Sequence, residues 1–357
     1  MLRVHAQQVQ PGMRLALPIR NPGTGLVLLR QGFELDDTTV SRLRKLDIPE
    51  VWIEYPGTEL IQDFCCPKIV RQQSMLTAML ADLFAHAHAD SYAHADYDDY
   101  RTAIGGLVNS IRDHPCGAWF LGEVAGRREE DGRHAAQVCV TAVLLGLHLE
   151  PYFVTQRKRL ESKYARNVTS LGLGAAMHDV GMLLLDPAVR ARVDEVADAS
   201  DPEWRMHVHR GYEMLAGSVS ASAVSVVLHH HQCFDGSGFP VVGDHGGPLA
   251  GDDIHVYSRV CAVADQFDHR RHRPGGVMVP RVRVLREMLT DGGDPRFDPV
   301  VLAALLYVMP AFPVGSVVRL TSGDLAVVVS ADPRHPCRPS VQIIAGCDGD
   351  STDLPPA

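Results

Sequence analysis

The chain has 357 residues, of which 46% are apolar and 22% charged, and its formal net charge is −9. This length allows two or three compact units with a core that needs no disulfide staples. The acidic balance argues against DNA binding, because no basic excess is available to neutralise phosphates. No run approaches the about 18 uninterrupted apolar residues of a membrane-spanning helix, and the start lacks an apolar signal core. We therefore expect a cytoplasmic protein without a membrane segment.

The first 60 residues predict a small α/β domain. Val27–Leu29 and Val51–Ile53 are short strand-like runs that end in turn residues. Between them, Asp37–Leu43 has the pattern of a short capped helix. This segment contains no cluster of chemically reactive side chains.

Residues 61–100 predict a connector. Ser74–Phe84 is expected to be helical, and the segment that follows is biased toward Ala, His, Asp and Tyr. One interpretation of its Ala-His pairs is loose metal binding, but such a composition is more typical of a polar linker or an exposed helix.

Residues 101–310 predict a run of helices, after which the pattern changes to strands. Val317–Leu320 and Leu325–Val329 are strand-like, and the turn residues between them predict a hairpin. The expected fold is mainly α, a helical bundle with a small N-terminal α/β domain and a short C-terminal β-hairpin extension. The predicted boundaries give domains at 1–60, 61–100, 101–310 and 311–357.

Histidines and aspartates lie on the apolar stripes of several candidate helices in residues 101–310. The residues with this placement, or directly beside it, are Glu130, His134, His178, Asp179, His207, His230, His231 and Asp265. A single histidine on an apolar face is more often a hydrogen-bonded core residue than a ligand. Several such stripes in one bundle instead favour a metal centre, because side chains from facing helices converge there. The mixture of histidine and carboxylate suits Fe, Mn or Zn.

Three consecutive histidines precede a tight turn. His229, His230 and His231 end an apolar run, and Asp235–Pro240 forms a Gly- and Pro-containing turn after them. His230 and His231 are the expected ligands, whereas His229 lies outside the helical register. The turn is expected to shape the rim of the site.

This set contains more ligands than one ion needs, and a carboxylate such as Asp179 can bridge two ions. Paired metal ions suit the hydrolysis of phosphate esters, because they lower the pKa of a bound water and neutralise charge on the phosphoryl oxygens. No protein nucleophile is then required. The chain has neither a GxxxxGK[ST] phosphate loop nor a GxSxG nucleophile motif.

In motif order and spacing, residues 101–310 resemble the HD-GYP family, a branch of the HD phosphohydrolases. The family motif HDxGK resembles His178–Met182, and HHExxDGxGYP resembles His230–Pro240. An HxxxG motif resembles His207–Gly211, and a late aspartate motif resembles Arg259–Asp265. Residues 1–60 are similar, less specifically, to a small accessory domain that often precedes such proteins.

The resemblance implies a helical HD-type bundle that binds two or three iron or manganese ions and hydrolyses cyclic di-GMP to pGpG or GMP. The implied metal ligands are His134, His178, Asp179, His207, His230, His231 and Asp265, with Glu130 for a third ion. Asp179 would bridge, and His178 and Asp179 would be the catalytic pair. A cyclic di-GMP-like nucleotide is the implied ligand, and a signalling protein or a second copy of the chain is a further candidate partner.

The chain departs from the family pattern where substrate is expected to bind. Met182 replaces the lysine of HDxGK, Gln232 the glutamate of HHE, and Phe239 the tyrosine of GYP. A thioether provides neither positive charge nor a hydrogen-bond donor. The candidate phosphate-binding residues are Arg273, Arg270 and Arg271.

Three interpretations therefore stay open. The chain is an active phosphodiesterase, a metal-containing nucleotide-binding or protein-interaction signalling module with impaired catalysis, or a bundle with a purely structural histidine cluster. The sequence favours the first, because all the expected ligands are present.

Overall fold

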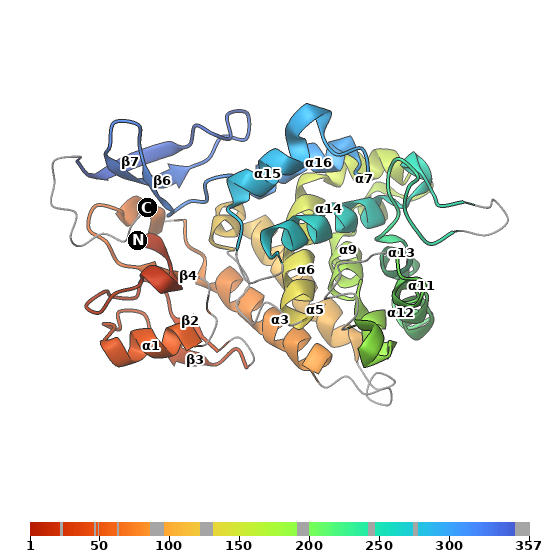
Figure 1. Cartoon of the computed structure of the whole chain (residues 1–357), viewed down its shortest axis with the longest axis horizontal. Helices are drawn as coiled ribbons and strands as arrows, with labels where there is room; N and C mark the ends of the chain where they lie inside the picture. Colours follow the sequence, from red (N-terminus) through yellow and green to blue (C-terminus); the bar gives the residue numbers. More distant parts are fainter. Residues whose placement is uncertain are drawn as a thin grey trace. The chain divides into compact units, whose positions relative to one another are not determined.

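The computed structural model describes residues 1–21, 24–45, 48, 50–62, 64–85, 96–121, 131–190, 200–241, 247–273 and 278–346. Its contacts divide the chain into two compact units. The first comprises Met1–Met79, Ser110–Arg127 and Met309–Ala357, and the second comprises Leu80–Asn109 and Arg128–Val308 (Figure 1).

Three small antiparallel sheets lie in the first unit. One sheet pairs β1 (Leu2–His5) with β4 (Glu50–Ile53), and a second pairs β2 (Ile19–Arg20) with β3 (Val27–Leu29). The third sheet has three strands, in the order β5 (Val317–Arg319), β6 (Leu325–Ser330) and β7 (Ser340–Ala345). Its helices are η1 (Ala6–Gln8), α1 (Asp37–Lys45), α2 (Glu59–Gln62), η2 (Pro115–Phe120) and the greater part of α3 (Pro67–Ala85).

The N-terminal and C-terminal segments share one hydrophobic core in the first unit. Leu325 and Val327 of β6 belong to the same buried cluster as Leu2 and Val51. The backbone N–H of Arg3 donates to the carbonyl of Gly315 at 2.7 Å, which joins the two ends of the chain directly. The domain boundaries predicted along the chain thus separate two segments that pack together in space.

Helices make up the second unit. They are α5 (Tyr97–Asp113, whose end belongs to the first unit), α6 (Asp131–His148), α7 (Glu150–Gln156), α8 (Ser162–Ala165), α9 (Val168–Ala176), η3 (Val180–Leu184), α11 (Pro202–Arg205), α12 (His207–Leu215), α13 (Ala221–His229), η5 (Gly251–Asp253), α14 (Val256–Arg271), α15 (Arg281–Leu289), η6 (Thr290–Gly292) and α16 (Pro299–Val308).

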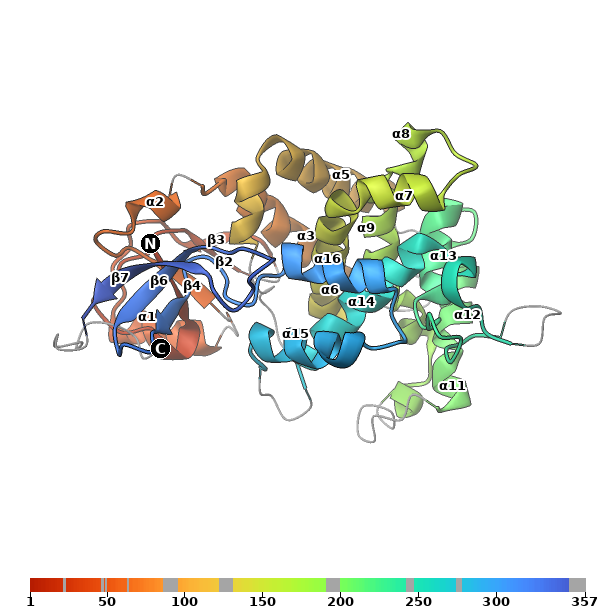
Figure 2. The ribbon, with the colours of Figure 1, turned by 90° about the horizontal axis from the view of Figure 1, so that it is seen from above.

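Helix α6 is the central element of the second unit. It packs against α9, α14 and α16, and α9 also packs against α13 (Figures 1 and 2). Ala135, Val138 and Ala142 on α6 are fully buried, which explains why an alanine- and valine-rich segment occupies the centre. The bundle therefore brings α6, α9 and α14 together around one interior.

The mainly α fold predicted from the sequence is confirmed, as are the C-terminal hairpin and the short helix predicted at Asp37–Leu43, which extends to Lys45. Strand β7 adds a third strand to that hairpin, and this strand was not predicted. Among the described helices, none alone is long and apolar enough to cross a membrane, although the bent pair Gly132–His148 and Glu150–Gln156 passes together by length and composition.

One expectation about the local structure is wrong. His178 and Asp179 are expected on a candidate helix, but α9 ends at Ala176 and the pair lies in the turn before η3. Trp204 and His207 belong to two separate helices, α11 and α12. Residues 175–180 contain no Gly or Pro that would indicate a helix end at Ala176.

Candidate metal centre

Three of the predicted histidines are held at helix ends through the same hydrogen bond. The Nδ1 atoms of His178, His207 and His230 lie 2.8, 2.8 and 3.0 Å from the carbonyl oxygens of the residues three positions earlier. A carbonyl accepts a hydrogen bond, so each Nδ1 carries the proton. The Nε2 lone pair of each ring is then directed away from its own backbone and is available to a metal.

His134 is held in the same way by a side chain. Its Nδ1 lies 2.7 Å from Oδ2 of Asp268, whose carboxylate also accepts two hydrogen bonds from Arg133, at 3.2 and 2.7 Å. His272 adds a third contact, with its Nδ1 2.9 Å from Oδ1. Asp268 is only 2% exposed, so these pairings compensate the cost of burying its charge.

The seven described ligand candidates form two clusters. Cluster A consists of Asp179, His207, His230 and His231, and cluster B of His134, His178 and Asp265. Within each cluster, one ligand atom from every residue lies within 4.8 Å of the others. The structure thus brings together all of these candidates. Glu130 lies outside the described residues.

Asp179 lies between the clusters. Its Oδ1 is 3.6 Å from Nε2 of His207 and 3.4 Å from Nε2 of His230, both in cluster A. Its Oδ2 is 3.1 Å from Nε2 of His178 and 3.8 Å from Nε2 of His134, both in cluster B. One carboxylate therefore offers one oxygen to each cluster.

Two glycines allow the turn that carries Asp179 to approach α12. A Cβ atom on Gly181 would lie 1.9 Å from the carbonyl oxygen of His207, and one on Gly211 would lie 2.8 Å from a methyl carbon of Val227. Any larger residue at Gly181 would push the turn away from His207. The glycines that follow the two histidines thus set the spacing inside cluster A.

Several ligand atoms are buried without a hydrogen-bond partner. In the part of the chain that the structure describes, these include Nε2 of His134, His178 and His231 and Oδ1 of Asp265. Unpartnered buried polar atoms are rare and costly, and an ion is one established explanation for them. Imidazole nitrogen and carboxylate oxygen together suit divalent Fe, Mn or Zn. The residues present therefore fit a metal centre.

The protonation states differ between the clusters. Burial lowers the pKa of His207 to about 4 and holds the pKa of His231 well below its ordinary value. Burial acts on His178 in the same direction, but Asp179 and Asp265 outweigh it and raise the pKa of His178 to about 9. Despite burial, the neighbouring histidines hold the pKa of both carboxyls well below the usual range.

An aromatic wall covers cluster A. The ring centroid of Phe239 lies 4.6 Å from that of His231 in a stacked arrangement, and the Trp204 ring lies 4.7 Å from His207. Gln232 holds the turn that carries Phe239: its Nε2 donates to the Pro240 carbonyl at 2.6 Å. Its Oε1 accepts from the backbone N–H of Leu249 at 2.9 Å. The glutamine that departs from the family pattern thus uses both its donor and its acceptor.

The three candidate phosphate-binding arginines are engaged in different contacts. Arg270 pairs with Asp294 at 2.8 Å, and Arg273 pairs with Glu287. Arg271 is buried, and its guanidinium donates to the carbonyl of Val279. The side chain of Arg273 is 45% exposed and that of Arg270 21%, so Arg273 is the more accessible to a substrate.

Sequence reasoning missed three residues of this region. They are Asp268, its partner Arg133, and His269, whose Nε2 lies 3.1 Å from Oδ1 of Asp265. The available signal was spacing: positions 268 and 269 follow Asp265 by three and four residues on one helix, so all three share a face.

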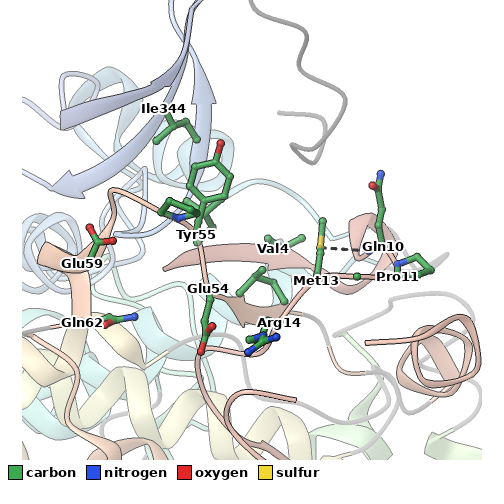
Figure 3. A pocket seen from close by; sticks show the side chains of 14 residues that line it. Val4, Gln10, Pro11, Met13, Arg14, Glu54, Tyr55, Glu59, Gln62 and Ile344 are labelled. Atoms are coloured by element: carbon green, nitrogen blue, oxygen red, sulfur yellow. Dashed lines mark hydrogen bonds between the residues drawn. The ribbon is translucent and has the colours of Figure 1, made fainter. Parts of the chain in front are cut away.

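A hollow of about 950 Å³ in the first unit is a separate feature (Figure 3). Gln10, Met13 and Arg14 line it together with Glu54 and other residues of the first unit, and none of the lining residues is a histidine, cysteine or aspartate. It therefore offers no imidazole to a metal ion, and we place the chemistry in the second unit.

Comparison with known proteins identifies relatives. The HD domain family model matches residues 154–301, a range that contains cluster A together with His178 and Asp265. The chain is 27% identical over 349 residues to "Cyclic di-GMP phosphodiesterase PA4108" of Pseudomonas aeruginosa, which covers 88% of this chain and 78% of that protein. It is 30% identical over 151 residues to "3'3'-cGAMP-specific phosphodiesterase 2" of Vibrio cholerae, which covers 41% of this chain and 25% of that protein.

A solved structure is also similar: Bd1817, an HDG"Y"P protein from Bdellovibrio bacteriovorus, matches with a TM-score of 0.47 at 13% identity, over 86% of this chain and 99% of that chain. The family model and the relative from Pseudomonas aeruginosa agree with the motif order of the sequence. The chain therefore contains an HD domain at residues 154–301.

Proposed function

We propose that the chain is a metal-dependent phosphodiesterase that hydrolyses cyclic di-GMP to pGpG or GMP. The observation that carries the proposal is the position of Asp179, whose two carboxylate oxygens face two separate groups of buried imidazoles. A bridging carboxylate between two ion positions suits the hydrolysis of a phosphodiester. The relatives named as phosphodiesterases of cyclic dinucleotides support this substrate class.

In this proposal the ligands are the residues of clusters A and B, with iron or manganese as the bound ions and Glu130 reserved for a third. Such ions would lower the pKa of a bound water, so that a nucleophilic hydroxide forms near neutral pH, and would neutralise charge on the phosphoryl oxygens. The hydrogen bonds at Nδ1 of His178, His207 and His230 keep the Nε2 atoms in the tautomer that can bind a metal.

The arginine side chains differ in exposure, and this difference ranks them as candidates for contact with the substrate. Arg273 is the first candidate for a substrate phosphate, because it is more exposed than Arg270 and Arg271 is buried. Met182 cannot supply the positive charge that the family lysine provides. Loss of one such cation usually lowers the rate by about a hundredfold to a thousandfold, so slow turnover is expected rather than none.

The test is hydrolysis by the purified full chain, loaded anaerobically with Fe(II) or Mn(II). Cyclic di-GMP and 3'3'-cGAMP are supplied separately, and linear products are separated by chromatography. We expect slow release of pGpG or GMP, absent from Asp179→Ala. A chain that binds two ions and binds nucleotide tightly without any turnover would instead be the impaired signalling module. A chain with less than about one ion after reconstitution would have a purely structural histidine cluster.

A further inference from the structure

His269 lies at the open side of cluster B. It follows Asp265 by four residues on α14, one helical turn away, so both side chains lie on one face of the helix. Its Nε2 is 3.1 Å from Oδ1 of Asp265, and its ring centroid is 4.5 Å from that of His134. The His269 side chain is 56% exposed, whereas that of His134 is 11% exposed.

Three ligand-type atoms converge here without hydrogen-bond geometry. Oδ1 of Asp265 has Nε2 of His134 and Nε2 of His269 at the same distance, 3.1 Å. Yet this oxygen is buried without a hydrogen-bond partner, as is Nε2 of His134. A simple ion pair would align an N–H with the oxygen. Atoms that approach one another without that alignment are arranged as ligands are around a common ion.

We infer that His269 is a further metal ligand, which joins cluster B beside Asp265 and His134. The spacing of two ligands four residues apart on one helix is a recurrent way to bind a metal ion from a single helical face. The inference rests on the metal-binding part of the proposed function and does not depend on turnover.

The added imidazole also predicts which ions cluster B prefers. Imidazole ligands suit iron, cobalt and zinc, whereas manganese and magnesium favour oxygen ligands. A cluster with three imidazoles therefore discriminates more strongly against Mn(II) than one with two. Because His269 is on the solvent side, its removal is expected to alter ion binding without disturbing the buried core.

The test compares His269→Ala and His269→Gln with the wild type by Co(II) titration of the metal-free full chain. Equilibrium dialysis gives the affinity and visible absorption reports the coordination. We expect both variants to lose at least about tenfold in affinity for one of the two ions and to change its absorption bands. The loss should be smaller for Mn(II). His335→Ala, which removes an exposed histidine of the first unit, is the control and should match the wild type.

His269→Gln decides between a ligand and a simple hydrogen-bond partner. Glutamine keeps a side-chain donor for Asp265 but offers no imidazole nitrogen. Wild-type affinity and an unchanged spectrum in this variant would overturn the inference. Hydrolysis of cyclic di-GMP is measured separately on the same samples. A Co(II) spectrum that depends on His269, without turnover, would reject the proposed phosphodiesterase but support His269 as a ligand. Turnover with Co(II) binding that does not depend on His269 would support the phosphodiesterase but reject His269 as a ligand.

Discussion

The two clusters of the metal centre are built by different means. In cluster A, His207 and His230 are oriented by backbone carbonyls, and Trp204 and Phe239 enclose the rings. In cluster B, His134 is oriented by a buried carboxylate that is itself paired with an arginine. Cluster A therefore depends on helix ends and aromatic packing, whereas cluster B adds a charge network around His134 to the helix-end hydrogen bond of His178.

The difference also concerns charge. Burial lowers the pKa values of His207 and His231 in cluster A, whereas the pKa of His178 in cluster B is raised because Asp179 and Asp265 outweigh its burial. At neutral pH an ion entering cluster A meets neutral imidazoles at His207 and His231, but an ion entering cluster B has to displace the proton of His178. The clusters should consequently respond differently to mutation and to pH.

Removing the residue that the clusters share should have the largest effect. Asp179→Ala deletes the oxygens that face both clusters, so we expect loss of both ions and a fall in rate of about a thousandfold or more, since bound ions contribute several kcal/mol to such reactions. Metal analysis and product chromatography measure the two effects. Asp332→Ala removes a carboxylate of the first unit and should change neither. Two ions retained per chain in Asp179→Ala would show that the clusters do not share a ligand.

Removing the carboxylate charge of Asp268, which holds His134, should affect cluster B alone. In Asp268→Asn, His134 loses its anionic partner and Arg133 is left buried without a carboxylate. We expect the ion at cluster B to bind about tenfold to hundredfold more weakly, and the free energy of unfolding to fall by about 3 kcal/mol. Metal titration and denaturant unfolding measure these.

The control for this variant is Asp294→Asn, which breaks pairs with Arg270 and Arg296 away from His134. It should keep both ions. If Asp268→Asn weakens the binding of both ions equally, the Asp268 network does not act on cluster B alone.

The pH dependence of the metal-free protein should separate the clusters. His207 has a pKa of about 4, below its unfolded value, so stability is lost as pH falls from about 6.5 to 4. His178 has a pKa of about 9, above its unfolded value, so stability is lost as pH rises from about 6.5 to 9. We expect an optimum near pH 6.5, with each side lower by on the order of 1 to 3 kcal/mol.

Thermal unfolding across pH, with and without saturating metal, measures this profile. Metal should flatten the alkaline side, because the ion replaces the proton of His178. A flat metal-free profile would show that the two clusters do not differ in charge.

The sequence predicted the membership of the clusters better than their construction. Helical spacing selected His134 and Asp265, which do lie on helices, and the structure gathers all seven described candidates. Helical spacing failed for His178, because residues 175–180 contain no Gly or Pro to mark the end of α9. Helix ends are decided by tertiary contacts, here the approach of Gly181 to α12, and local spacing does not contain that information.

Long-range pairings were equally inaccessible. Arg133 meets Asp268 across 135 residues, and β6 packs with strands from the other end of the chain. Both contacts depend on the fold as a whole. His269 was overlooked for a different reason: the polar stretch after Asp265 has the pattern of a solvated helix end, and only the distance to Oδ1 of Asp265 distinguishes it from one.

The smallest expected effect tests the wall of cluster A. Gln232→Glu keeps the acceptor for Leu249 but loses the donor to the Pro240 carbonyl, and it introduces a buried charge. We expect about 1 to 2 kcal/mol less stability at pH 7, because a buried acceptor is left unsatisfied. The turn that positions Phe239 on His231 should become less well fixed. Ion binding at cluster A should therefore weaken, while ion binding at cluster B should not change. Gln10→Glu, at an exposed glutamine, is the matched control.

If Gln232→Glu is as stable as the wild type and binds both ions unchanged, the amide does not hold the wall. The departure from the family glutamate would then lack a structural role, whereas the predicted loss would show that this chain needs an amide where the family uses an acid.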